Sequence, residues 1–334
     1  IALRIKPGCL IIVESTLPPG TTKKIIYPEI VKIFKKRKIQ LDKIRLAYSF
    51  ERVTPGSNYL NSIKLMHRVY AGINKQSELK VKRFLKSIID LNNAKLCKLS
   101  NITEVETCKI IENTYRAMNI AFIEEWRNFS SLNDLNLNKI LNFIRLRKTH
   151  NNIMRPGIGV GGYCLTKDPL MGEIASKKIL KKLVKLPISQ NIVRINQRMP
   201  KEVLSDIEKR LQFKKLKEKN VFLFGASYRQ GVGDTRFSAS EFVYNYFLKK
   251  KCKIRVIDPY LNYWKEVKCK VYNDFDYNKA DIAFFLVPHK QFKNIKLNFK
   301  KNCIVIDSNN VFSEKKSLTI KKKYKKNYII GNYN

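Results

Sequence analysis

Three polar side chains share one face of a helix that the sequence predicts. Lys109, Asn113 and Arg116 stand at positions i, i+4 and i+7, so an ammonium, an amide and a guanidinium lie on the same face. A lysine can relay a proton, and an amide can donate a hydrogen bond to a developing oxyanion. The same spacing is also typical of a solvated helix face, and spacing alone leaves both interpretations open.

A cysteine follows a glycine-rich stretch, PGIGVGGYC (residues 156–164). Glycines such as Gly161 let a chain approach a ligand closely or adopt positive φ. Because Lys167 and Asp168 come just after it, Cys164 fits an activated nucleophile, with a cysteine buried in a tight turn as the alternative. The other cysteines form no C-x-x-C pair. We therefore expect neither a metal site nor a disulfide framework, and a reducing, cytoplasmic location.

Two polar residues come shortly after predicted strands in the N-terminal third. Thr16 follows the strand 10–13, and Glu51 follows the strand 44–49. Open α/β sheets place their ligands at the carboxyl ends of the strands, so both residues are candidates for a ligand site. The alternatives are a helix N-cap for Thr16 and a surface acid for Glu51.

Two arginines frame a loop in the last third of the chain. Arg229 and Arg236 bound the segment RQGVGDTR, which follows a predicted strand at 221–224. Two guanidinium groups with flexible glycines between them suit a diphosphate, and a solvated loop is the alternative. Of three scattered histidines, His150 lies nearest the glycine-rich stretch.

The elements that would position these residues change in type along the chain. Strands separated by helical stretches predict α/β architecture for the first 100 residues. A capping box at Thr103 and Glu106 predicts the start of a helix that reaches about Phe129 over roughly 40 Å, and such a helix is typical of a helical domain or a dimer interface. The last third returns to a βαβ series of Rossmann type. The expected strands are 10–13, 44–49, 68–73, 221–224, 253–257, 282–287 and 303–306.

The composition limits the classes of protein that remain possible. The 334 residues include 67 Lys and Arg against 27 Asp and Glu, a net charge of +40, and 44% are hydrophobic, which is enough for a packed core. No apolar run reaches the roughly 18 residues of a membrane helix, and no signal peptide is indicated. The basic runs at 177–185 and 321–326 hold at most one aromatic residue. They therefore indicate a solvated surface rather than a track for nucleic acid.

Seven segments, in order along the chain, resemble the UDP-glucose/GDP-mannose dehydrogenase family. The ERV and ENTYRAMNIA segments are most similar to the branch that oxidises UDP-N-acetylhexosamines such as UDP-N-acetylmannosamine, and UDP-glucose is the alternative substrate. The matching segments are ESTLPPGTT (14–22), FERVTPG (50–56), HRVYAG (67–72), EVETCKIIENTYRAMNIAF (104–122), RPGIGVGGYCLTKDP (155–169), GASYRQGVGDTRFSAS (225–240) and IDP (257–259).

The resemblance implies a four-electron oxidation of a sugar C6 alcohol to a carboxylate with two NAD⁺, serving surface polysaccharide synthesis. Cys164 would capture the intermediate aldehyde as a thiohemiacetal, which is then oxidised to a thioester. Lys109 and Asn113 would stabilise the oxyanion. Thr16, Lys109 and Asp168 would hold a water that moves protons, and Glu51 would assist hydrolysis of the thioester.

The resemblance also implies residues for the ligands and a partner. The UDP-sugar would be held by Arg52, Val53, Arg116, His150, Gly161, Arg229 and Arg236. The cofactor NAD would contact Thr16, Glu51 and Arg236. The partner would be a second copy, in a homodimer formed through the central helical domain, with no metal, membrane or nucleic acid involved.

The implied architecture has three parts. Residues 1–100 would be the end of an NAD-binding Rossmann domain, 101–213 an all-α dimerisation and catalytic domain, and 214–334 a UDP-binding Rossmann-like domain. The family's opening strand and glycine loop are absent, so about 100 residues are expected to precede Ile1, and we expect weak NAD binding. A remnant that only dimerises and binds UDP-sugar is therefore a second hypothesis. Four positions depart from the family pattern, namely Phe50, Glu124, Tyr163 and Arg229.

Overall fold

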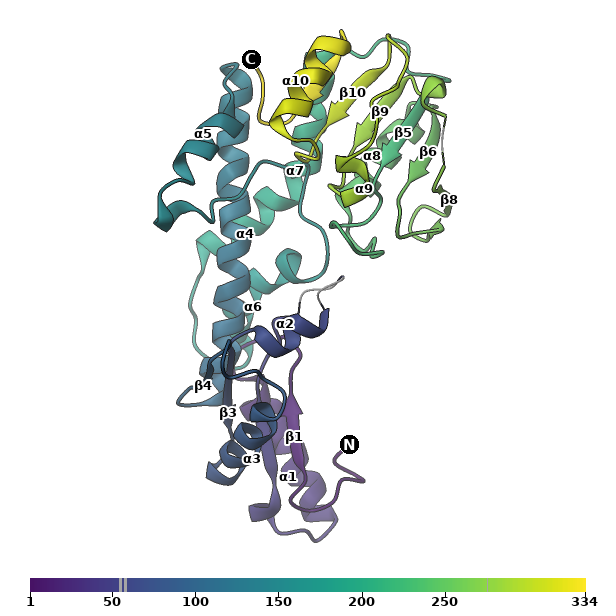
Figure 1. Cartoon of the computed structure of the whole chain (residues 1–334). Coiled ribbons are helices and arrows are strands. Elements are labelled where there is room, and N and C mark those ends of the chain that lie inside the picture. Colours follow the sequence, from purple (N-terminus) through teal and green to yellow (C-terminus); the bar gives the residue numbers. More distant parts are fainter. Residues whose placement is uncertain (54–55, 57–58, 275) are drawn as a thin grey trace. The chain divides into compact units, whose positions relative to one another are not determined.

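The computed structural model describes residues 1–53, 56, 59–274 and 276–334. The chain divides into two compact units (Figure 1). Unit 1 comprises Ile1–Tyr115 and Lys167–Gln190, and unit 2 comprises Arg116–Thr166 and Asn191–Asn334. Three helices run from one unit into the other: α4 (Ile102–Leu132), α6 (Cys164–Lys178) and α7 (Pro187–Leu211). The division into 1–100, 101–213 and 214–334 stays a prediction.

Unit 1 is built on a mixed sheet of four strands. The order is β1 (Leu10–Val13), β2 (Arg45–Tyr48), β3 (Arg68–Gly72) and β4 (Leu96–Lys98). β1 pairs with β2 in parallel, β2 with β3 antiparallel, and β3 with β4 in parallel. The three strands expected from apolar runs are confirmed. β4 was missed because it has only three residues and lies half exposed, so it carries no buried apolar run.

Short helices complete unit 1. A π-helical turn, η1 (Thr22–Ile26), leads directly into α1, and the 3₁₀ turn η2 precedes β2. Tyr48 and Phe50, at the end of β2, pack with Val105 of α4 in one hydrophobic cluster. This contact fixes the carboxyl end of β2 against the first turns of α4. The bounds are α1 Tyr27–Lys36, η2 Leu41–Lys43, α2 Tyr59–Leu65 and α3 Lys75–Lys86.

The long helix α4 begins at Ile102, earlier than expected, and extends to Leu132 over 31 residues. The capping box predicted at Thr103 and Glu106 is wrong. The Asn101 side chain accepts from the backbone N–H of Glu104 at 3.0 Å, and the Glu104 carboxylate accepts from that of Ser100 at 2.9 Å. The reciprocal cap lies two residues earlier because an asparagine also caps a helix. Glu106 therefore does not cap the helix, and its carboxylate makes other contacts.

Unit 2 is built on a sheet of seven strands in the order β11-β10-β9-β5-β6-β8-β7. All neighbours are parallel except β7 and β8. After β5 the chain adds β6 on one side and later returns to add β9 on the other, so the direction of winding changes between β5 and β9. This is the position at which open α/β sheets bind ligands. The bounds are β5 Asn220–Phe224, β6 Lys253–Ile257, β7 Tyr263–Trp264, β8 Cys269–Tyr272, β9 Ile282–Phe285, β10 Ile304–Asp307 and β11 Asn327–Ile329.

The four predicted strands of the last third are confirmed, and the expected helix 239–250 corresponds to α8 (Ala239–Lys249). The strands β7, β8 and β11 were missed, since each is short and interrupted by polar residues. The remaining helices of unit 2 are α5 Leu137–Ile144, η3 Lys148–His150, η4 Tyr277–Lys279, α9 Lys290–Lys293 and α10 Glu314–Lys323. The fold class is mixed α/β, with parallel sheets, a long central helix and a C-terminal sheet domain, as expected.

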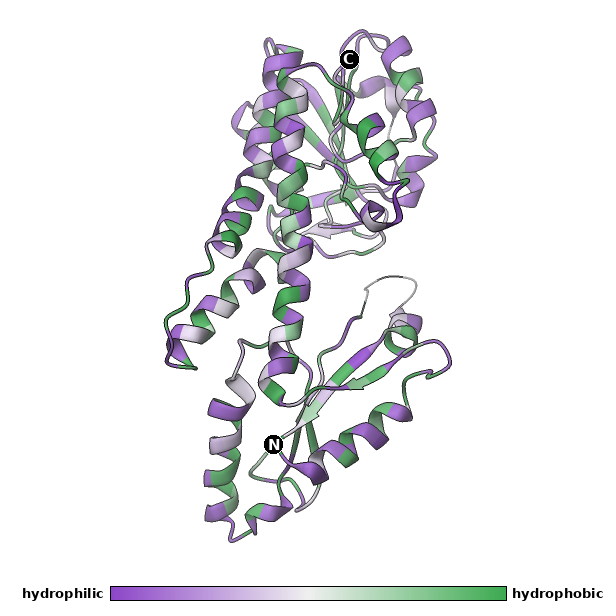
Figure 2. Cartoon of the chain, turned by 90° about the vertical axis from the view of Figure 1, so that its left-hand side faces the viewer, coloured by the Kyte–Doolittle hydropathy of each residue, from purple (hydrophilic) through white to green (hydrophobic). Residues whose placement is uncertain are grey.

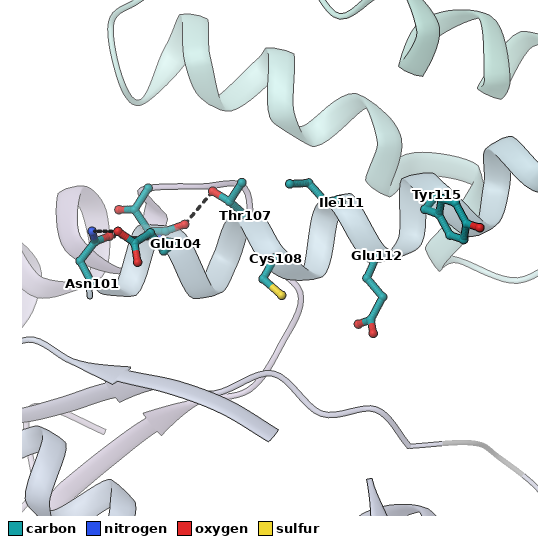
Figure 3. Close-up of a pocket in the computed structure, with 8 residues that line it drawn as sticks. Asn101, Glu104, Thr107, Cys108, Ile111, Glu112 and Tyr115 are labelled. Atoms are coloured by element: carbon teal, nitrogen blue, oxygen red, sulfur yellow. Dashed lines mark hydrogen bonds between the residues drawn. The ribbon is translucent and has the colours of Figure 1, made fainter. Parts of the chain in front are cut away.

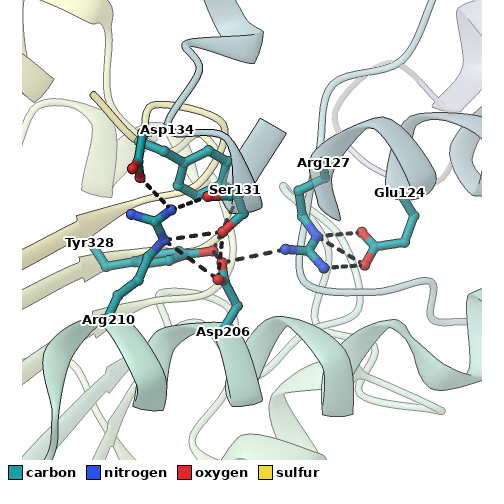
Figure 4. Close-up of polar contacts among 8 residues, drawn as sticks. Glu124, Arg127, Ser131, Asp134, Asp206, Arg210 and Tyr328 are labelled. Atoms are coloured by element: carbon teal, nitrogen blue, oxygen red, sulfur yellow. Dashed lines mark hydrogen bonds and ion pairs between the residues drawn. The ribbon is translucent and has the colours of Figure 1, made fainter. Parts of the chain in front are cut away.

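A buried polar network joins α4, α7 and β11 within unit 2 (Figure 4). The Arg127 guanidinium lies 2.7 Å from the Glu124 carboxylate, and both side chains are almost completely buried. Asp206 of α7 lies 3.4 Å from Arg127 and accepts from the hydroxyl of Tyr328 at 2.7 Å. Burial alone would lower the pKa of Arg127, but the Glu124 carboxylate outweighs burial and raises it. Position 124, where the family pattern has asparagine, is therefore one half of a buried ion pair.

Hydrophobic and hydrophilic residues alternate along α4 (Figure 2), in keeping with a helix that is only partly covered. Among the helices that the structure describes, none combines the length and the apolar character needed to cross a membrane.

Candidate functional site

Asp168 is the buried centre of the polar residues in unit 1. Its side chain is 0% exposed, and its carboxylate accepts from the Asn113 amide at 2.6 Å and from the Lys167 ammonium at 2.7 Å. Asn113 lies on α4 and Asp168 on α6, so the contact joins two helices within the unit. A buried carboxylate requires such partners, because an unpaired buried charge is costly. The structure thus brings together two of the predicted catalytic residues.

Lys109 lies one turn before Asn113 on α4 and contacts the end of β2. Its ammonium donates to the backbone oxygen of Glu51 at 3.0 Å and lies 5.2 Å from the centre of the Phe50 ring. Phe50, where the family pattern has proline, therefore adds a cation–π contact to the lysine. Because one ammonium carries three donors, Lys109 keeps N–H groups for another acceptor.

The residues after β2 turn back on themselves. The Glu51 carboxylate accepts from the backbone N–H of Val53, and the Arg52 guanidinium donates to Glu112 of α4 at 2.9 Å. Arg52 is therefore already paired with a carboxylate, which its residue type alone did not predict. Thr16 is half-buried in the segment after β1. Thr54 and Pro55 of the FERVTPG motif lie outside the described residues.

Glu106 was missed as a functional residue because the sequence suggested a helix cap. It is fully buried, and its carboxylate accepts from the backbone N–H of Gly20 at 2.5 Å and of Thr22 at 2.8 Å. The Thr22 hydroxyl donates to it as well, at 2.7 Å. Burial raises the pKa of Glu106, although these hydrogen bonds work against the shift. Glu106 thus fixes the ESTLPPGTT segment, including Thr16, to α4.

The glycine-rich stretch packs closely within unit 2. A Cβ on Gly161 would lie 2.6 Å from the Tyr228 Cβ, and Gly162 adopts a φ of +77°. Both positions therefore require glycine. The backbone N–H of Gly162 donates to the carbonyl of Arg236 at 3.0 Å. Of the two alternatives for the glycines, positive φ is found at Gly162, and the close approach at Gly161 is to Tyr228 of the neighbouring loop.

Cys164 is the first residue of α6, and its side chain is exposed and outside any disulfide. The buried-cysteine alternative is therefore wrong. Asp168 follows one turn later on the same helix, since residues four apart share a helix face. A helix N-terminus favours a negatively charged group, which suits a thiolate at this position.

The loop after β5 carries the two predicted arginines. Arg236 is exposed, pairs with Asp234 at 2.5 Å, and lies 4.9 Å from the centre of the Tyr163 ring. The hydrogen bonds to Asp234 raise the pKa of Arg236 and lower that of Asp234. Tyr163, where the family often has histidine, thus supports Arg236. Arg229 is half-buried in the same loop.

Two predicted binding residues lie on the surface of unit 2. Arg116 is exposed on α4, and His150 is exposed in η3, where its Nδ1 lies 2.8 Å from the Thr149 hydroxyl. The structure gives neither residue a described contact with Arg229 or Arg236. Within the residues described, no group of three or more His, Cys, Asp and Glu side chains is placed to hold a metal ion.

A cavity of unit 1 on the surface of α4 does not coincide with the predicted site. It is an open groove of about 650 Å³ along the first turns of α4, bordered by Thr107, Cys108, Ile111 and Tyr115 among others (Figure 3). Its lining is mostly apolar, and none of the predicted catalytic side chains borders it. Such a surface suits packing against another protein rather than chemistry on a sugar.

Two segments of the chain match models of one known protein family. Residues 103–198 match the central domain of the UDP-glucose/GDP-mannose dehydrogenase family, and residues 222–314 match its UDP binding domain. The UDP-N-acetyl-D-mannosamine dehydrogenase of Methanococcus aeolicus is 32% identical over 327 residues, which cover 92% of this chain and 67% of that protein.

Two solved structures have the same arrangement of elements. The UDP-D-ManNAc dehydrogenase of Pyrococcus horikoshii superposes with a TM-score of 0.75 at 26% identity, covering 94% of this chain and 72% of the other. The NDP-N-acetyl-D-galactosaminuronic acid dehydrogenase of Methanosarcina mazei superposes with a TM-score of 0.82 at 24% identity, covering 99% and 71%. At this identity the second comparison establishes the fold alone.

Proposed function

The chain belongs to the UDP-glucose/GDP-mannose dehydrogenase family, and on this premise we propose that it oxidises the C6 alcohol of a UDP-N-acetylhexosamine to the carboxylate. The observation that supports the proposal is the buried Asp168 carboxylate, held by Asn113 at 2.6 Å within unit 1. The named relatives act on UDP-N-acetyl-D-mannosamine, which favours a hexosamine over glucose. UDP-glucose remains the alternative substrate.

Cys164 is the proposed nucleophile. The first oxidation removes a hydride and a proton from the alcohol and leaves an aldehyde. The Cys164 thiolate adds to the aldehyde carbon, and the carbonyl oxygen becomes the oxyanion of a thiohemiacetal. Loss of a second hydride gives a thioester, and water then replaces the sulfur, releasing the carboxylate and the thiol. Covalent capture keeps the half-oxidised sugar in place for the second oxidation.

Lys109 and Asn113 are proposed to stabilise the oxyanions. The Asn113 amide carries two N–H groups, of which one is engaged by Asp168, so the other can reach a developing charge. The Lys109 ammonium is held by the Glu51 carbonyl and can donate in the same way. We assign Asp168 and Thr16 to the positioning of a water that moves protons, and Glu51 to assisting hydrolysis of the thioester.

The proposed hydride acceptor is a nicotinamide dinucleotide, contacted by Thr16, Glu51 and Arg236. When bound, the dinucleotide would accept the hydride that leaves the sugar. A dinucleotide also needs a backbone cradle for its pyrophosphate, commonly the N–H groups at the start of a helix. In the turn before α1, the N–H groups of Gly20 and Thr22 are occupied by the buried Glu106. The described residues of unit 1 therefore do not fit a pyrophosphate at this turn. The roles proposed above are those of this chain's own side chains.

A second candidate function is a protein that binds UDP-sugar without oxidising it. In both candidate functions, the loop after β5 would bind the diphosphate of the sugar nucleotide through Arg229 and Arg236. Arg52, Val53, Arg116, His150 and Gly161 are the remaining proposed contacts of the sugar nucleotide. In either case the protein would act in the cytoplasm, and an active enzyme would supply uronic acid for surface polysaccharide.

We also propose that α4 mediates a homodimer. Four large apolar side chains at helical spacing are exposed along it: Met118, Phe122, Trp126 and Phe129. Phe122, Trp126 and Phe129 form a ladder of edge-on ring contacts. An exposed apolar stripe on one helix face suits a two-fold interface, in which the same face of a second copy covers it.

Two measurements test the proposal. The absorbance of NADH at 340 nm should rise when UDP-N-acetylmannosamine and NAD⁺ are added, with two NADH formed per carboxylate, and the Cys164→Ser variant should form at most the first NADH and no carboxylate. Calorimetry then separates the two functions. Binding of UDP-sugar with no binding of NAD⁺ supports the non-oxidising candidate, and activity retained in Cys164→Ser refutes the thioester route.

A further inference from the structure

A buried carboxylate organises the start of the arginine-bearing loop in unit 2. Asp258 directly follows β6, and its Oδ2 accepts from the backbone N–H groups of Ala226 at 2.9 Å and Ser227 at 3.1 Å. The same oxygen lies 3.2 Å from Nε2 of His289, the residue that precedes α9. Burial alone would raise the pKa of Asp258, but the hydrogen bonds from His289 and the backbone lower it. The carboxylate is therefore ionised and acts only as an acceptor.

The second nitrogen of His289 contacts the middle of the loop. The backbone N–H of Gly231 donates to Nδ1 at 3.1 Å. A backbone N–H can only donate, so Nδ1 carries no proton, and the ring proton lies on Nε2, from which it is donated to Asp258. The neutral His289 ring thus links the Asp258 carboxylate to the Gly231 amide, and its single N–H proton lies on Nε2.

Burial makes this bridge hard to replace by solvent. His289 is 0% exposed, and its ring lies against Tyr260 and Phe292 at centroid distances of 5.1 and 5.5 Å. Gly231 is only half-buried, but the ring that accepts from its amide is fully buried and held on its other side by Asp258. The His289 ring is therefore a fixed acceptor for the Gly231 amide.

Gly231 lies between the two arginines of the loop and adopts a φ of +75°. The far end of the loop is tied separately, since the Arg236 carbonyl accepts from Gly162 at 3.0 Å. Asp258 holds the start, His289 the middle and Gly162 the end. The distance between Arg229 and Arg236 is thereby constrained at three points.

We propose that His289 is a positioning residue that holds the loop 225–238 in the form that binds the diphosphate of the substrate. The histidine does not touch the ligand in this account and acts through the Gly231 amide. The inference rests on the proposed function, because that function assigns the diphosphate to this loop. No role for His289 was expected from the sequence.

Two substitutions separate the two arms of the bridge. In His289→Asn the side-chain oxygen occupies the place of Nδ1 and can accept from Gly231, whereas the link to Asp258 is lost. In His289→Gln the amide nitrogen occupies the place of Nε2 and can donate to Asp258, whereas the acceptor for Gly231 is lost. Each variant loses one of the two hydrogen bonds of the ring, the buried one to Asp258 or the half-buried one from Gly231, so a purely structural role would not weaken UDP binding selectively in His289→Gln.

Titration calorimetry of the whole chain with UDP gives the decisive comparison. We expect His289→Gln to weaken UDP binding about tenfold and His289→Asn by less than about threefold, with similar decreases in melting temperature. The control is Tyr324→Phe, which removes two buried hydrogen bonds elsewhere in unit 2, to the Leu297 carbonyl (2.8 Å) and from the Phe299 backbone N–H (3.2 Å), and should leave UDP affinity unchanged. Equal affinities of the two His289 variants would overturn the proposal.

Hydrogen exchange distinguishes failure of this proposal from failure of the proposed function. The Gly231 amide should exchange faster in His289→Gln than in the wild type or in His289→Asn. If the wild type binds no UDP, the assignment of the diphosphate to this loop is wrong, whatever His289 does. If UDP binds but the Gly231 amide exchanges at the same rate in all three proteins, the positioning role alone is wrong.

Discussion

The side-chain amide of Asn113 and the carboxylate of Asp168 meet at 2.6 Å within unit 1 and join α4 to α6. Asp168 is fully buried and has the Lys167 ammonium as a second partner, at 2.7 Å. The carboxylate therefore fixes the orientation of the amide and leaves its second N–H with a defined direction. This arrangement turns a residue that could have been ordinary helix surface into a candidate oxyanion donor.

Asn113→Ala should slow NADH formation by about 10²- to 10³-fold, the usual loss when one oxyanion donor is removed. The KM for the sugar nucleotide should change much less, because the donor acts in the transition state. Asn119→Ala is the matched control, since Asn119 lies on the same helix and donates to the Asn152 carbonyl at 3.0 Å. Equal losses of rate in the two variants would show that only the stability of the helix matters.

Glu106→Gln should destabilise unit 1 by about 2 kcal/mol at neutral pH, because the amide cannot satisfy all the donors of Gly20 and Thr22. Urea unfolding followed by circular dichroism measures the difference. Glu104→Gln is the control, since Glu104 is exposed and caps the start of the same helix. A loss no greater than that of the control would contradict the anchoring role of Glu106.

The pH dependence of that difference has a defined sign. Burial raises the pKa of Glu106 in the folded chain above its ordinary value of 4.5, so the folded state binds the proton more tightly than the unfolded state. The advantage of the wild type over Glu106→Gln should be greatest below about pH 4.5 and fall as the pH rises through the folded-state pKa. Urea midpoints of both proteins between pH 4 and pH 8 test this, and an advantage that grows with pH would contradict it.

Arg127→Met should be strongly destabilising, by about 3 to 5 kcal/mol, because it leaves the buried Glu124 carboxylate without its 2.7 Å partner. The double variant Glu124→Met/Arg127→Met should recover much of this loss, since replacing both charges with apolar groups is often tolerated. Urea unfolding of the two single variants and the double variant gives the coupling energy. Additive effects would show that the two charges do not depend on one another.

Trp126→Glu should shift the protein from dimer to monomer, because a charge on the exposed apolar stripe of α4 would be buried in the interface. Sedimentation velocity measures the change. Asn128→Glu is the control, as Asn128 is exposed on another face of the same helix. A wild-type monomer, or dissociation by both variants, would contradict the proposed interface.

Much of the fold could be predicted from local patterns, and the exceptions have physical causes. The strand 10–13 is confirmed because it is a compact apolar run, and the strand 253–257 is confirmed because its charged and apolar residues alternate with the period of a strand. The strand β4 was missed because it has only three residues and little burial, and β7 was missed because it has only two residues. The cap of α4 was placed two residues late because Thr103 and Glu106 match the same pattern as Asn101 and Glu104, which form it.

The sequence indicated which residues would form the candidate site, but it did not indicate most of the contacts that they make. The pairs that Lys109 and Asn113 form with Glu51 and Asp168 agree with roles assigned from the resemblance, although the roles themselves remain proposals. Glu106 and His289 were missed because their importance comes from burial and from partners more than 50 residues away, which no local motif reveals.

The most direct test of the account is whether the Cys164 sulfur adds to a sugar aldehyde. The C6 aldehyde of UDP-N-acetylmannosamine, labelled with ¹³C at C6, is mixed with the protein and followed by ¹³C NMR, which requires no hydride acceptor. The account predicts a thiohemiacetal resonance in the wild type and in Cys97→Ser, a control at another exposed cysteine, and none in Cys164→Ser. The same resonance in Cys164→Ser, or its absence from the wild type, would contradict the proposed chemistry.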